Sequence, residues 1–213
     1  MKKLTLAAAL AASAFAMGAN AATTSASFNI TGKVVPSACT ISTGADNGTI
    51  DFGTISAYNL SGTPFFNKSA SLSVACDTET TALIKVSGSK GVLEEAQRFQ
   101  TDQEFATYQV LVKNLHVTDG TATNSVLITA NPDDEVDMNH LSDSSFKKYA
   151  AASFPLNGKY FGAATSNSGV GTFKNLTADL SVAAYIDAEK AKAAVKDGEK
   201  TFAGTLNFEL NYL

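Results

Sequence analysis

The chain has 213 residues and a formal net charge of −4, and it contains two cysteines, four prolines and no tryptophan. A mildly acidic chain without clusters of Lys and Arg argues against nucleic acid as a partner. A chain of this length can bury one sizeable hydrophobic core, so we expect a single domain. Its many Thr, Ser, Val, Ala and Gly residues favour an all-β fold over a helical one.

The first residues have the composition of a secretory signal peptide. A short basic start precedes an apolar run from Leu4 to Met17, and Ala19 and Ala21 supply the small-x-small pattern of a cleavage site. The run is shorter than the roughly 20 apolar residues of a membrane helix, so a membrane anchor is the less favoured alternative. We expect residues 1–21 to be removed by cleavage after Ala21 or Ala22. We expect the mature chain to be exported, without a membrane span of its own.

The two cysteines, Cys39 and Cys76, both lie in the expected mature chain. In an exported protein, an even number of cysteines is most simply explained by disulfide bonding. Metal binding is the alternative, but two cysteines without a histidine nearby make a poor metal site. The sequence therefore predicts one disulfide between Cys39 and Cys76.

Short segments in which apolar and polar residues alternate recur along the chain, separated by turn residues. Alternation of this kind predicts strands, because successive side chains of a strand point to opposite faces of the sheet. Many short strands joined by turns predict one antiparallel β-sandwich, which we place over residues 22–213. We expect a turn at residues 77–80 and strands within residues 27–35, 48–55, 71–76, 82–86, 108–113, 124–129, 149–161 and 179–186.

Residues 187–198 differ from the rest of the chain, because they are rich in Ala, Lys and Glu. These residues favour a helix. Asp187 is a suitable N-cap and Gly198 a suitable C-terminal stop. We expect a short helix just before the last strand.

The last predicted strand covers residues 202–212 and has one apolar and one polar face. A strand of this kind needs a pairing partner, in its own chain or in another. The even positions form the apolar face: Phe202, Gly204, Leu206, Phe208, Leu210 and Tyr212.

Nothing in the sequence predicts catalysis or a cofactor. His116 alternates with apolar neighbours and is expected to face solvent from a strand, and His140 has no second ligand at metal-binding spacing. The acidic stretch at residues 131–137 lacks the spacing of a calcium loop, so a solvated acidic face is the better interpretation. We expect a protein that is not an enzyme and that needs no cofactor.

Several segments, in this order, resemble subunits of the chaperone–usher pili (fimbriae) of Gram-negative bacteria. The first resembles the pilin strand that ends at a cysteine, and a later one resembles the strand that carries the partner cysteine. The last strand, with Tyr212 as its penultimate residue, is similar to the C-terminal strand that a periplasmic chaperone recognises in pilins. It also resembles an uncharacterised fimbrial-like branch of this superfamily. The matching segments are residues 28–39, 50–55, 71–76, 108–113, 154–161 and 202–212.

The resemblance implies an immunoglobulin-like, pilin-type antiparallel β-sandwich with one disulfide, to which the composition of residues 187–198 adds a short helix before the last strand. It implies a structural subunit that contributes to surface adhesion and is assembled by donor-strand complementation. Its implied partners are a periplasmic pilus chaperone, an outer-membrane usher and neighbouring fimbrial subunits. The protein would pass through the periplasm to a fimbrium at the cell surface.

The sequence departs from the pilin pattern in two places. The stretch before the first strand, from which pilins donate a strand, is short and lacks a glycine. Residues 187–198 also separate two late strands, at 179–186 and 201–213, either of which could be the last strand of a pilin. The alternative function is therefore a self-complemented periplasmic or surface binding module that does not polymerise. The candidate donor residues are Thr23, Thr24, Ser25, Ala26, Ser27 and Phe28.

Overall fold

The computed structural model describes residues 38–44, 48–93, 95–129, 136, 146–149 and 156–213. These residues belong to one compact unit, Pro36–Leu213, which is separate from the unit Met1–Val35. The predicted signal peptide at residues 1–21, the candidate donor residues at 23–28, the strand at 27–35 and His140 lie outside the described residues. Among the described residues, no helix has the length and apolar character to cross a membrane.

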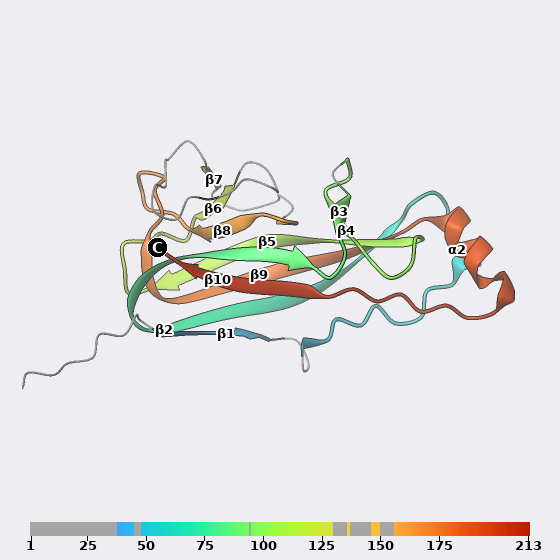
Figure 1. Cartoon of the computed structure of the whole chain (residues 1–213), viewed down its shortest axis with the longest axis horizontal. Helices are drawn as coiled ribbons and strands as arrows, with labels where there is room; N and C mark the ends of the chain where they lie inside the picture. The colour runs from blue at the N-terminus through green and yellow to red at the C-terminus, as the bar shows by residue number, and fades with distance from the viewer. Residues whose placement is uncertain (1–37, 45–47, 94, 130–135, 137–145, 150–155) are drawn as a thin grey trace, which may run out of the picture. The chain divides into compact units, whose positions relative to one another are not determined.

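The described unit is built mainly from strands, all of which pair antiparallel. Two short 3-10 helices and one α-helix complete it (Figure 1). In chain order the elements are β1 (Cys39–Thr43), η2 (Ala57–Asn59), β2 (Phe65–Gly88), β3 (Val92–Leu93), β4 (Arg98–Gln100), β5 (Ala106–Thr118), β6 (Val126–Thr129), β7 (Phe146–Tyr149), β8 (Tyr160–Ala163), β9 (Thr172–Ile186), α2 (Ala188–Ala194), η4 (Val195–Asp197) and β10 (Leu206–Tyr212).

The strands form two layers that share the long strand β2. In the first layer, the N-terminal half of β2 lies between β1 and β9, and β5, β4 and β3 continue the sheet beyond β9. In the second layer, the C-terminal half of β2 pairs with β10 on one side and with β8 on the other, followed by β6 and β7. The predicted antiparallel β-sandwich is therefore confirmed.

The turn predicted at residues 77–80 is wrong, because β2 runs through this region without a break. The pairing of β2 with β9 instead shifts register between Ala75 and Thr80. Thr80 is buried, and its hydroxyl donates a hydrogen bond to the carbonyl of Thr78 at 3.0 Å. β-Branched residues favour extended backbone, so a run of threonines can continue a strand where polarity alone suggests a turn.

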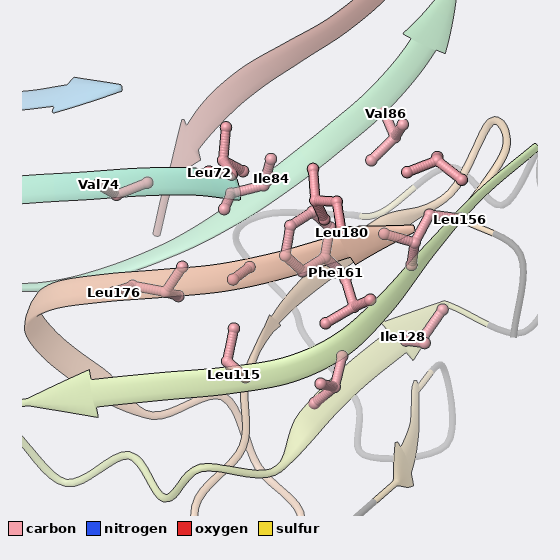
Figure 2. Close-up of a cluster of buried hydrophobic side chains, with 14 of the residues drawn as sticks. Leu72, Val74, Ile84, Val86, Leu115, Ile128, Leu156, Phe161, Leu176 and Leu180 are labelled. Atoms are coloured by element: carbon pink, nitrogen blue, oxygen red, sulfur yellow. The ribbon is translucent and has the colours of Figure 1, made fainter. Parts of the chain in front are cut away.

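The core lies between the two layers and is made of side chains that alternate along the strands. Leu72 and Val74 reach it from the first layer, while Ile84 and Val86, further along the same strand β2, reach it from the second layer (Figure 2). Burying a Leu, Ile, Val or Phe side chain contributes roughly 1.5–3 kcal/mol, so this interior stabilises the sandwich. Other fully buried members are Val110, Val112, Leu156, Phe161 and Leu176.

The short helix predicted before the last strand is confirmed as α2. Asp187 is its N-cap, and the carboxylate of Asp187 accepts a hydrogen bond from the Lys190 amide at 3.0 Å. The following turn ends at Gly198, whose φ of 118° is one that residues with a side chain rarely adopt. The buried residues of the helix are Ala188 and Ala191. The helix lies at the end of the sandwich opposite the C-terminal end of β10 (Figure 1).

The predicted disulfide is also confirmed. Cys39 and Cys76 lie directly opposite each other on β1 and β2, with an S–S distance of 2.04 Å. Their Cα atoms are 4.0 Å apart, and 37 residues of sequence separate them. The bond therefore joins the edge strand β1 covalently to the strand that both layers share.

Reduction of this disulfide should lower the free energy of unfolding by up to about 4 kcal/mol, because the unfolded chain would lose a loop constraint. Denaturant unfolding of oxidised and reduced protein measures this difference. The Cys76→Ser variant should be as unstable as the reduced wild type and should not respond to reductant. Equal stability of oxidised and reduced wild type would contradict this account.

Candidate functional site

The last strand, β10, lies at an edge of the second layer. It pairs antiparallel with β2, from Leu206 opposite Gly88 to Tyr212 opposite Ala82, and with no other strand of the described residues. It does not lie beside β9, which is an interior strand of the first layer between β2 and β5. In the described unit, β10 and β9 therefore lie in different layers and do not pair with each other.

The hydrogen bonds at both ends of β10 show which of its backbone groups face the open edge. Leu213 donates its amide to the carbonyl of Thr81, and Ser89 donates its amide to the carbonyl of Thr205. In an antiparallel ladder, alternate residues turn their N–H and C=O groups to the same side. The odd-numbered residues of this segment thus bond toward β2, and the even-numbered residues turn their backbone groups outward.

A second wall is formed by the segment that follows β1. Ile50 and Phe52 pack against the main core, and both are partly buried. No backbone hydrogen bond joins residues 49–55 to another described segment. The strand predicted at residues 48–55 is therefore wrong as a paired strand, although its alternating apolar side chains do reach the core.

Between these two walls lies a groove of about 860 Å³. One wall is the stretch from Gly48 to Ile55, and the other is the stretch from Glu199 to Leu206 that leads into β10. The inner face of the first layer forms the floor, and α2 and η4 close one end. Floor and end residues include Thr101, Phe105, Tyr108, Val182, Ile186, Ala191 and Val195.

The inward side chains of β10 are only partly buried. Leu206, Phe208 and Leu210 pack against the main core but keep part of their surface accessible, whereas Asn207 and Glu209 are exposed. The predicted two faces are therefore visible in the burial of residues 206–210 only, because residues 202–205 precede the strand and, at its end, Asn211 is partly buried while Tyr212 is exposed. Apolar side chains that are covered on one side and accessible on the other form a surface on which a further apolar element can be buried.

Two sets of contacts limit the groove and the open edge of β10 along their length. Toward the end of β10, the Cys39 amide donates a hydrogen bond to the Tyr212 hydroxyl at 3.2 Å. Toward α2, the ring centroids of Phe52 and Phe202 lie 6.3 Å apart, and Phe202 also contacts Phe105 edge-on. Tyr212, which belongs to the predicted apolar face of this strand, is 43% exposed.

Tyr108 fixes the wall that leads into β10. Its hydroxyl donates a hydrogen bond to the carbonyl of Thr205 at 2.6 Å, and burial raises the pKa of this phenol to about 12. Its ring lies so close to Gly204 that a Cβ there would come within 2.5 Å of it. A residue with a side chain at this position would therefore clash with the Tyr108 ring, and only glycine allows the ring to pack here.

The site combines predicted and unpredicted residues. The apolar positions of residues 202–212 were predicted, and the structure brings Phe202, Gly204 and Leu206 to the groove. Tyr108 was predicted as part of a strand but not as a groove residue. The sequence held one indication that a bulky side chain packs here, because Gly204 is the one small residue on the apolar face of the last predicted strand. Among the described residues, no group of three or more His, Cys, Asp or Glu side chains could hold a metal ion.

No protein-family model matches the chain, and no curated protein matches it. Among solved structures, the chain is similar to the crystal structure of the P pilus rod subunit PapA. The similarity covers 88% of this chain and 99% of that chain, with 16% sequence identity and a TM-score of 0.38. The strand pairing of this chain gives the sandwich, and the groove lies between its walls as the residues that line it show.

Tyr108→Phe should lower the free energy of unfolding by about 1 kcal/mol near neutral pH, because the Thr205 carbonyl loses one of its two donors and keeps only the Ser89 amide. The folded-state pKa of about 12 lies above the ordinary value of 10. The corresponding stabilisation is therefore full below pH 10 and is lost as the pH rises toward 12. Denaturant unfolding at several pH values measures both effects.

Tyr58→Phe is the matched control, since Tyr58 is 74% exposed. It should leave both the stability and its pH dependence unchanged. A Tyr108→Phe protein that loses stability above pH 10 as steeply as the wild type would contradict the assignment.

Proposed function

We propose that this protein is a structural subunit of a chaperone–usher fimbria and that its groove holds an extended strand from a neighbouring subunit. The observation that carries the proposal is the open edge of β10, whose outward backbone groups and partly buried apolar side chains begin at Leu206, where the strand meets the groove. A strand placed there would gain hydrogen bonds from its backbone and would bury its alternate side chains, which is the physics of β-augmentation.

The edge of β10 has the periodicity that such a strand requires. From Gly204 to Leu210, every second residue turns its N–H and C=O groups toward the open edge. An added strand with the same repeat would place alternate side chains over Tyr108 and the neighbouring core residues and the others toward solvent. Apolar residues at alternate positions are therefore the expected signature of the donor.

We further propose that a periplasmic chaperone occupies the groove before assembly and that an outer-membrane usher exchanges it for the neighbouring subunit. The resemblance of the ordered sequence segments to pilins supports these partners. Passage through the periplasm to a cell-surface fimbrium, a contribution to adhesion and the absence of a catalytic role belong to the same proposal. The candidate donor of this chain itself is the stretch from Thr23 to Phe28.

Production of residues 22–213 in a bacterial periplasm tests the open groove. Without a chaperone, the chain should aggregate or unfold at low denaturant, because its groove is empty. A synthetic peptide of residues 22–35 should restore soluble protein and raise the unfolding midpoint, since a ligand that binds the folded state stabilises it. A scrambled peptide of the same composition is the control.

A matched pair of substitutions on β10 tests whether the stabilising peptide binds at this strand. Phe208→Ala should weaken peptide binding and cost about 2 kcal/mol of stability, because Phe208 packs against the core from the open-edged strand β10. Asn207→Ala, on the exposed face of the same strand, should change neither quantity. A soluble monomer that unfolds cooperatively without peptide and does not bind it would refute the proposal and favour the self-complemented binding module.

A further inference from the structure

The outer face of the first layer carries a cluster of aromatic and hydrogen-bonding side chains that the groove does not use. We define the outer patch as Phe65, Asn67, Arg98, Gln109 and Tyr185. Alternation along β9 separates it from the groove, since Tyr185 points outward while its neighbour Ile186 lines the groove on the inner face. The outer patch is therefore independent of donor-strand pairing.

Arg98 is held flat on the outer patch. Its guanidinium carbon lies 3.4 Å from the centroid of the Tyr185 ring, which is cation–π stacking distance. The residue is partly buried, yet it makes no hydrogen bond or ion pair within the described part of the chain. Stacking on the ring face leaves the N–H groups along the guanidinium edge available, in the planar geometry that binds a carboxylate with two hydrogen bonds.

Tyr185 is itself fixed by a hydrogen bond, because its hydroxyl donates to the Gln109 side-chain oxygen at 3.0 Å. This bond uses the acceptor of the Gln109 amide and leaves its NH2 group as a donor. Asn67 lies in the same cross-strand row, since Asn67 and Gln109 both pair with Ala183. The exposed Asn67 side chain can donate or accept. The side-chain amides of Gln109 and Asn67 thus offer mainly hydrogen-bond donors near Arg98.

An apolar ring lies beside these donors. Phe65 is 57% exposed, and its ring centroid lies 5.5 Å from that of Tyr185. Phe66, the next residue, packs instead into the cluster beneath α2, so the backbone keeps the Phe65 ring on the outer face. An accessible aromatic face on a rigid strand is a surface on which the C–H face of a ring-shaped ligand can lie.

The charge around the outer patch suits an anion. The chain has a formal net charge of −4, yet the outward positions of β2, β5 and β9 beside the patch contain no carboxylate. They are Ser69, Thr107, Leu111, Ser181 and Ala183. Arg98 itself pairs with Leu93 of β3, and the exposed Glu95 lies in the turn between β3 and β4. A carboxylate bound to Arg98 would therefore meet no like charge from β2, β5 or β9.

We propose that the outer patch binds an acidic saccharide. The sugar carboxylate would pair with the Arg98 guanidinium, its apolar ring face would lie on Phe65, and its hydroxyls would bond to Asn67 and Gln109. A flat sheet face offers no backbone hydrogen bonds, so an extended peptide would gain less here than at an open edge. A ligand that combines an anion, hydroxyls and an apolar face matches all of the groups present.

Saccharide binding by the full mature chain tests the proposal, with the complementing peptide present so that the groove is filled. Binding is measured by NMR titration with sialyllactose and with a hyaluronan tetrasaccharide, and lactose is the neutral probe. The wild type should bind the acidic sugars about tenfold more tightly than lactose, because one charge-assisted bidentate contact is worth on the order of 1.4 kcal/mol or more. Arg98→Gln should abolish this preference, and Phe65→Ala should weaken binding of all three sugars.

Two controls separate this site from general effects of charge and exposed rings. Lys85 also lies over a tyrosine, 5.3 Å from the centroid of the Tyr160 ring, so Lys85→Gln should leave the preference unchanged. Tyr58→Ala removes a 74% exposed ring elsewhere and should have no effect. Unfolding midpoints verify that each variant is folded. Failure to bind either acidic sugar, equal binding of acidic and neutral sugars, or an Arg98→Gln variant that keeps its preference would overturn the proposal.

Discussion

An unpaired strand edge is the constraint on which the rest of this structure depends. Backbone N–H and C=O groups at an edge need partners, and water, a second strand or another chain must supply them. In β10 the unmet groups coincide with Leu206, Phe208 and Leu210, whose side chains are only partly covered. One added strand would satisfy both the polar and the apolar requirement, and for this reason the edge is the centre of the proposed function.

The strands β1 and β10, next to the two walls of the groove in the sequence, both pair with the same strand. The N-terminal half of β2 holds β1 through pairing and through the Cys39–Cys76 disulfide, and its C-terminal half holds β10. Because β2 belongs to both layers, its geometry fixes the relative position of the walls. Tyr108 adds a third anchor from the floor by binding the Thr205 carbonyl. These anchors position the groove for an added strand, while the apolar side chains of β10 stay partly uncovered until that strand binds.

Local patterns in the sequence predicted the features that depend on neighbouring residues. The two faces of residues 206–210, the N-cap at Asp187 and the stop at Gly198 follow from alternation and capping chemistry, and the structure contains them. Features that depend on distant pairing were missed. β2 pairs with β1 and β9 in one layer and continues past Cys76 to pair with β10 and β8 in the other, and the stack of Arg98 on Tyr185 joins separate strands. Residues 48–55 have a strand-like pattern, but they have no pairing partner among the described residues.

Amide hydrogen exchange along β10 tests the open edge most directly, in isolated protein and after addition of the complementing peptide. The amides of Asn207 and Glu209 face β2 and should be protected in both states, whereas those of Phe208 and Leu210 should exchange rapidly until the peptide binds. Protection that appears on addition of peptide at the even positions alone is the predicted result. Strong protection of Phe208 and Leu210 in the isolated chain would show that this edge is already paired and would contradict the account.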